Sequence, residues 1–396
     1  MKKLIKHDCD YNMKLTMKLK KINFIQGMIW GGILTLGWYF RTFNISLARS
    51  WLDELDAMKM VRNFSPLESV RIYGQPWLHY ALIWLVQKLG DGLNWTTSQI
   101  DLFDRYLSVF LSMGAIGGGY YLGKWVFKKI EYAFLVAWIV ACMQLQVYYA
   151  QEIRMYALWG SLAIWSWALW WKNLNEINKR SVVALTIVNA AMLLTHSLSV
   201  IFLVSQIAVA VFYTAIKKKR LSLVIAVNLV LLFVFGLTFV PAVYKYGANY
   251  TDREFNWRRI FKPIVDVTEF WPQVRLFRRL SGIEFSKLLG VLSIACLGIS
   301  AVVKKTRAIG GGILIAFLVS IGSLHVMLAL GLLHLFATRY LIFLSGMYAL
   351  LWPSVVYWFE EKRVVKNVLI VGVSLMYLAM MILYLRENPI HYDLMP

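Results

Sequence analysis

Residues 132–171 read YAFLVAWIVACMQLQVYYA-QEIR-MYALWGSLAIWSWALWW, which is two long apolar runs on either side of a short polar turn. Neither run, Tyr132–Ala150 or Met155–Trp171, contains an Asp, Glu, Lys or Arg. A helix needs about 20 apolar residues to cross the hydrocarbon core of a bilayer. The stretch therefore predicts two membrane-spanning helices that are joined by a tight turn.

The composition extends this prediction to the whole chain of 396 residues. Hydrophobic residues make up 59% and charged residues 16%, and the mean hydropathy is +0.59. An average soluble domain is about 45–50% apolar and about 25% charged. The chain has too few polar residues to coat soluble domains and too many aromatic residues to be disordered. We therefore predict a multi-spanning membrane protein.

Apolar runs of spanning length recur from one end of the chain to the other. His196 divides one of them, because residues 181–216 as a single helix would be about 54 Å long, too long for one crossing. The sequence therefore predicts an all-α polytopic membrane protein with about 11 transmembrane helices. The predicted spans are Ile22–Phe40, Tyr106–Gly123, Tyr132–Ala150, Met155–Trp171, Ser181–Thr195, Ser197–Ile216, Leu221–Tyr244, Leu288–Val303, Ala308–Leu330, Tyr340–Phe359 and Asn367–Leu385.

The distribution of basic residues predicts the topology. The formal net charge is +21, which in a soluble protein would suggest nucleic acid, but here the charge lies in short clusters between apolar runs, and we predict no nucleic-acid partner. With an odd number of crossings, the clusters fall on the side of the N-terminus. They are Lys124/Lys128/Lys129, Lys172/Lys179/Arg180, Lys217–Arg220, Lys304/Lys305/Arg307 and Lys362/Arg363/Lys366.

The odd number of predicted crossings places the two ends of the chain on opposite sides of the membrane and divides the chain into three parts. Residues 1–21 form a basic cytoplasmic N-terminal segment, 22–385 a multi-spanning membrane domain, and 386–396 an outer C-terminal tail. The domain lies in the cell membrane and has two long outer loops, 41–105 and 245–287. The first loop contains Trp77–Leu89, which is too short to span, and the amphipathic stretch Ser50–Asn63, so both are predicted to lie in the interface.

Two groups of charged residues in the predicted outer turns could carry chemistry. Asp53 and Glu54 follow the first span among apolar neighbours, where a carboxylate can act as a general base, although acids also favour the first turn of any helix. Glu152 and Arg154 lie in the tight turn before Tyr156. Charges in such a place are costly unless they are paired or functional, so a salt bridge and a shaped site both remain open.

The other candidates each have a structural alternative. His196 in the next outer turn could be catalytic or simply hydrogen-bonded. Arg105 and Arg339, the latter followed by Tyr340, could bind a phosphate or snorkel to the interface. His79 could face the site or anchor a helix at the membrane surface. Together these residues suit a site that binds a lipid phosphate and deprotonates an acceptor.

The order of these pieces resembles the family 39 type of membrane glycosyltransferases in the GT-C fold group, which includes protein O-mannosyltransferases and lipid A aminoarabinose transferases. The shared features are the Asp53-Glu54 pair, the aromatic segment Tyr73–Tyr80, Arg105, the Gln151–Leu158 turn (Gln-Glu-x-Arg-x-Tyr-Ala-Leu), His196 and Arg339-Tyr340-Leu341. The Gln151–Leu158 stretch matches most closely. The chain departs from the pattern at Gln75-Pro76, where many relatives have a His-Pro-Pro type sequence.

The resemblance implies transfer of a sugar, with inversion, from a polyprenyl-phosphate carrier to a glycan, lipid or protein acceptor at the outer leaflet. Asp53 would be the general base, and Glu54 would position it or bind the sugar. Glu152 would hold donor or acceptor, and Arg154 and Arg339 would bind the donor phosphate.

The sequence leaves other assignments open. A lipid-phosphate ligase or phosphotransferase of envelope glycans is the alternative function. A transporter or flippase is less favoured, because charged residues lie almost only at the ends of the predicted spans. No cofactor is indicated, although a divalent metal at Asp53, Glu54 and Glu152 is left open.

Overall fold

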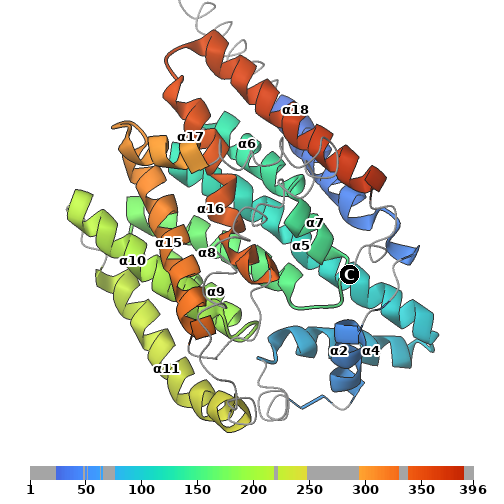
Figure 1. Cartoon of the computed structure of the whole chain (residues 1–396). Coiled ribbons are helices and arrows are strands. Elements are labelled where there is room, and N and C mark those ends of the chain that lie inside the picture. The colour runs from blue at the N-terminus through green and yellow to red at the C-terminus, as the bar shows by residue number, and fades with distance from the viewer. Residues whose placement is uncertain are drawn as a thin grey trace, which may run out of the picture.

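The computed structural model describes residues 24–47, 50, 52–62, 64–65, 76–217, 222–247, 294–329 and 338–387. The basic segment 1–21, residues 248–287 of the second outer loop, tail residues 388–396 and the Tyr73–Gln75 part of the aromatic segment lie outside the described residues. Within the described ranges the chain is helical and contains no strand (Figure 1). The all-α prediction is thus confirmed for this part of the chain.

Helices follow one another with short connections through the described ranges. A first helix covers residues 24–42, and residues 294–302 form another. The named elements are η1 (Ile45–Leu47), α2 (Leu52–Arg62), α4 (Leu78–Gly92), α5 (Thr97–Phe127), α6 (Ile130–Ala141), α7 (Gln144–Ala150), α8 (Tyr156–Asn175), α9 (Lys179–Leu193), α10 (Ser199–Lys217), α11 (Ser222–Gly247), α15 (Arg307–Ala329), η4 (Thr338–Leu344), α16 (Ser345–Ala349), α17 (Leu351–Trp358) and α18 (Arg363–Glu387).

Several of these elements are long and apolar enough to cross a membrane. In the described part of the chain they are the segments Ser199–Ile216, Arg307–Met327, Tyr340–Trp358 and Arg363–Arg386. The pair α6 and α7 meets the same criterion together but is bent by 51°. These helices are those of a membrane protein, while the number of about 11 crossings stays a prediction.

The amphipathic stretch and the short apolar segment of the first predicted outer loop both form helices. Ser50–Asn63 contains α2, and the segment Trp77–Leu89 forms most of α4 after its N-cap residue Trp77. Both helices lie together beside the start of α5 (Figure 1). His196 lies in the turn between α9 and α10, as expected from the length of the run that it divides.

Helix α5 packs against both α6 and α8, and small residues allow the close approach. A Cβ atom added at Gly119 would lie 2.9 Å from a Val140 methyl carbon, and one at Gly123 would lie 2.8 Å from the Tyr132 carbonyl oxygen. Transmembrane helices use small residues in this way because van der Waals packing, rather than water exclusion, drives their association. The α5–α6 pair is therefore closely packed along these glycines.

A buried arginine stabilises the bend between α6 and α7. The last carbonyl groups of a helix lack intrahelical partners. Arg41 donates hydrogen bonds to the carbonyl oxygens of Ala141 at 3.0 Å and Val140 at 3.2 Å, and its Nε donates to Ser112 Oγ at 2.9 Å. The Ser112 hydroxyl in turn donates to the Gln146 carbonyl oxygen at 3.2 Å. Hydropathy does not indicate this role, because in the sequence Arg41 is simply the first residue after an apolar run.

A polar network joins α8, α9, α10 and α11 in their buried interior. Asn189 Nδ2 donates to Gln206 Oε1 at 3.0 Å and to Asn228 Oδ1 at 2.8 Å. Gln206 Nε2 donates to Ser166 Oγ at 2.7 Å, and the Ser166 hydroxyl donates to Asn189 Oδ1. Such interhelical hydrogen bonds fix neighbouring helices in register where no water can replace them.

Candidate functional site

Four segments that are distant in sequence meet near the beginning of α5. They are the first turn of α2, the first turn of α4, the turn at 151–155 and the turn around His196. The Leu78 N–H donates to the Leu194 carbonyl oxygen at 2.8 Å, which joins the start of α4 to the His196 turn. Hydrogen bonds and ion pairs link these segments into one site.

A buried ion pair connects α2 to α5. Arg105 Nη1 and Nη2 each donate to one Glu54 carboxylate oxygen at 3.1 Å, and the exposed fractions of the two side chains are 3% and 0%. The same guanidinium donates to Ser50 Oγ at 3.2 Å and to the Gln151 carbonyl oxygen. Glu54 Oε1 also accepts from the Ile153 N–H at 2.7 Å. Both terminal nitrogens of Arg105 therefore donate hydrogen bonds to groups of the protein itself.

Asp53 lies at the edge of this arrangement and remains accessible. Its side chain is 31% exposed, and its Oδ2 lies 3.8 Å from Arg154 Nη2. Arg154 Nη1 donates to the Asp53 carbonyl oxygen at 3.0 Å, and the Arg154 side chain is also hydrogen-bonded to Tyr156. The two adjacent carboxylates therefore lie in different environments. Glu54 is fully buried, whereas Asp53 is accessible.

His79 lies in the first turn of α4, where the positive charge of Arg154 acts on its ring. The side chain is fully buried, and neither ring nitrogen has a hydrogen-bond partner among the described residues. Burial, with a smaller effect of the Arg154 charge, lowers the pKa of His79 to about 3. The ring is therefore neutral at physiological pH and can act as a hydrogen-bond donor and acceptor, but not as a cation for a phosphate.

An aromatic cluster surrounds His196. The imidazole stacks on Trp159 with the ring centres 4.1 Å apart and an interplanar angle of 12°. Tyr156 and Tyr340 lie around it at 5.8 Å and 6.3 Å between ring centres. The Leu198 N–H donates to His196 Nδ1 at 3.1 Å, so a neutral ring carries its proton on Nε2.

The structure brings most of the predicted site residues together. Glu152 is buried in the turn between Gln151 and Ile153, and the Arg154–Tyr156 contact joins that turn to the His196 cluster. Arg339 lies in η4 directly before Tyr340, but its side chain lies outside the described residues. The described residues contain no group of three His, Cys, Asp or Glu side chains that could hold a metal ion.

Asp104, which the sequence does not single out, directly precedes Arg105 of the Arg105–Glu54 pair. Its side chain is buried, and Gln87 Nε2 donates to Oδ2 at 3.0 Å, whereas Oδ1 has no hydrogen-bond partner among the described residues. Burial raises the pKa of Asp104 to about 7, although the hydrogen bond from Gln87 opposes this shift. In the sequence Asp104 is only an acidic residue before Arg105. The burial of its side chain depends on tertiary packing and could not be predicted.

Stability should depend on pH through Asp104. The folded state keeps a proton that the unfolded chain releases at its ordinary pKa of 3.8, so Asp104 increasingly destabilises the fold as the pH rises from about 4 to about 7, and the lost stability stays constant above that. We expect Asp104→Asn to unfold at a higher temperature than the wild type at about pH 8 and at nearly the same temperature at about pH 4. Thermal unfolding in detergent across this range, with the exposed Asp91→Asn as the control, measures the effect. Parallel pH curves for Asp104→Asn and the wild type would contradict it.

Comparison with protein-family models and with curated protein sequences gives no match. Among solved structures, the oligosaccharyltransferase of Archaeoglobus fulgidus, crystallised with zinc and sulfate, aligns with a TM-score of 0.49 and 13% sequence identity. The alignment covers 90% of this chain and 53% of that protein, so the chain spans about half its length.

Proposed function

We propose that the protein is a membrane glycosyltransferase that moves a sugar from a polyprenyl-phosphate carrier to an acceptor hydroxyl, with Asp53 as the general base. The observation that carries this proposal is the contact between Asp53 and Arg154, an accessible carboxylate next to a nearly buried guanidinium. Transfer from a sugar phosphate needs a base for the acceptor and a cation for the leaving phosphate. This pair supplies both, and its residues match the sequence resemblance.

In the proposed reaction the acceptor oxygen attacks the anomeric carbon opposite the carrier phosphate. The new carbon–oxygen bond forms as the bond from the anomeric carbon to the phosphate oxygen breaks, and the configuration inverts. The acceptor proton moves to Asp53, and the phosphate departs with the bonding electrons. Arg154, whose Nε has no hydrogen-bond partner among the described residues, stabilises the charge that develops on the phosphate. Arg339 is proposed as a second cation for the same phosphate.

The contacts divide the remaining residues between positioning and binding. Glu54 and Arg105 hold the first turn of α2 against the 151–155 turn, so Arg105 positions Asp53 rather than binding the donor phosphate. Because the neutral ring of His79 is fully buried, it is proposed to bind a sugar hydroxyl only when the substrate displaces its present neighbours. In the aromatic cluster, Tyr156 and His196 are buried, so the half-buried ring of Tyr340 is proposed to pack against the face of a sugar and the other two to hold it in place. Glu152, in the turn between these groups, is proposed to hold the donor or acceptor.

The direct test is incubation of the purified full chain with a panel of polyprenyl-phosphate sugars and candidate acceptors. We expect one donor to release free polyprenyl phosphate together with a glycosylated product. A lipid-phosphate ligase or phosphotransferase would instead release polyprenyl diphosphate or form a phosphodiester, and mass spectrometry of the products separates these outcomes. Phosphodiester products would replace the proposed reaction with the alternative one.

A further inference from the structure

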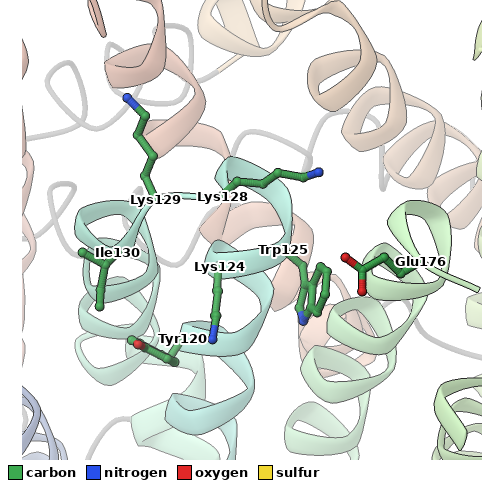
Figure 2. Close-up of a pocket in the computed structure, with 7 residues that line it drawn as sticks. All are labelled: Tyr120, Lys124, Trp125, Lys128, Lys129, Ile130 and Glu176. Atoms are coloured by element: carbon green, nitrogen blue, oxygen red, sulfur yellow. The ribbon is translucent and has the colours of Figure 1, made fainter. Parts of the chain in front are cut away.

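A hollow of about 380 Å³ opens at the end of α5 that is remote from Asp53. Lys124 and Lys128 line it from the end of α5, Lys129 from the turn into α6, and Glu176 from the end of α8 (Figure 2). Because Arg105 and Lys128 are 23 positions apart along one helix, the hollow lies about 35 Å from the candidate site. The proposed reaction does not use this hollow.

The hollow has an excess of positive charge. Lys129 forms an ion pair with Glu360, which also lies 3.4 Å from Lys366. No ion pair is present for Lys124 or Lys128 within the described ranges, and Glu176 is the single carboxylate of the lining. Two unpaired ammonium groups thus remain for an anionic ligand.

The backbone at Lys128 adopts a conformation that favours glycine. Lys128 follows α5 as the C-cap residue in the left-handed conformation, with φ 57° and ψ 25°. The only other described non-glycine residues with positive φ are Asn44 and Asn94, and asparagine tolerates this conformation well. Glycine is the usual residue after a helix end in this conformation, because a Cβ atom is unfavourable there. The chain keeps a lysine where glycine would be less strained.

Part of the wall of the hollow is apolar, and its side chains lie among the lysines (Figure 2). Tyr120, Trp125 and Ile130 line it, and Ile130 is 40% exposed at the surface of the bundle. A small soluble anion would gain nothing from this wall, whereas a lipid presents a phosphate and an acyl chain together. Basic pockets between transmembrane helices are suited to such head groups.

We propose that this hollow binds the head group of an anionic phospholipid, with the phosphate at Lys124 and Lys128 and the acyl chain along the surface that includes Ile130. Glu176 accepts hydrogen bonds from donor groups of the head group beside the phosphate. The site holds a structural lipid at the membrane face opposite the candidate catalytic site.

The test is titration of the purified full chain in neutral detergent with short-chain phosphatidylglycerol, followed by native mass spectrometry. Each lysine near an anionic lipid contributes about 1 kcal/mol, so Lys124→Gln with Lys128→Gln should weaken binding about 25-fold. The control is Lys304→Gln with Arg307→Gln, which removes the same charge from another basic cluster and should leave the affinity unchanged. Phosphatidylcholine of equal chain length should bind the wild type weakly.

Lys128→Gly separates binding from folding. It should weaken phosphatidylglycerol binding about fivefold, while the melting temperature of the lipid-free protein stays equal or rises, because glycine relieves the left-handed backbone. Equal weakening by the control pair would overturn the proposal in favour of diffuse surface attraction. Displacement of the lipid by millimolar inorganic phosphate would also overturn it, in favour of a site for a soluble anion.

Discussion

We expect Asp53→Asn to remove nearly all sugar transfer while the protein still folds and inserts into the membrane. Asparagine has nearly the shape of aspartate, and its amide oxygen can still face Arg154, but it cannot take the acceptor proton. General-base catalysis contributes about 100- to 10,000-fold to a rate, so we expect a loss of that size. The rate of carrier release with the donor found in the panel measures it.

Asp56→Asn is the matched control for this variant. Asp56 lies on the same helix, its side chain is 56% exposed, and its nearest cation is Lys59 at 3.6 Å. Its replacement should leave the rate within about twofold of the wild type, because an exposed pair of this kind contributes little. A wild-type rate in Asp53→Asn would end the assignment of Asp53 as the base, although the general function could survive with another base.

The second large effect is expected at the Glu54–Arg105 pair. Glu54→Gln leaves the Arg105 guanidinium buried opposite a neutral amide, and breaking a buried pair in this way costs about 3–5 kcal/mol. We expect a markedly lower unfolding temperature in detergent and a loss of transfer, because the first turn of α2 is no longer held against the 151–155 turn.

An exposed ion pair in the neighbouring helix provides the comparison. Lys88 Nζ lies 3.5 Å from Asp91 Oδ2, with the side chains 56% and 60% exposed. Asp91→Asn should change the free energy of unfolding by less than about 1 kcal/mol. If Glu54→Gln proved as mild as Asp91→Asn, then the Arg105 contacts would not determine the stability of the site.

Much of the helical fold could be predicted from hydropathy alone. The run that ends near Ala150 and the one that begins at Met155 became α6–α7 and α8, because long apolar stretches must satisfy their backbone groups internally. The bend between α6 and α7 could not be predicted. It depends on Arg41, a residue about 100 positions away, whose guanidinium reaches the carbonyl groups at the break.

The sequence was enough to select several residues of the candidate site, but not to predict which residues they contact. Asp53, Glu152 and Arg154 stand out as charges next to apolar runs, and such positions are costly without a reason. Their partners depend on long-range packing. The sequence could not indicate that Glu54 would pair with Arg105 rather than assist Asp53 directly, or that His79 would be buried as a neutral ring.

The amino-acid sequence by itself determined that the chain is helical and apolar enough for a membrane, and that its unusual charges lie at helix ends. These properties follow from composition and periodicity, which act within one segment of the chain. Only the tertiary structure decided which of two adjacent carboxylates is buried and which is accessible, because that choice depends on how α2 is turned against α5 and the 151–155 turn. Arg105 and Arg154 take Glu54 and Asp53 as their separate partners, and contacts between segments so far apart are created by folding alone.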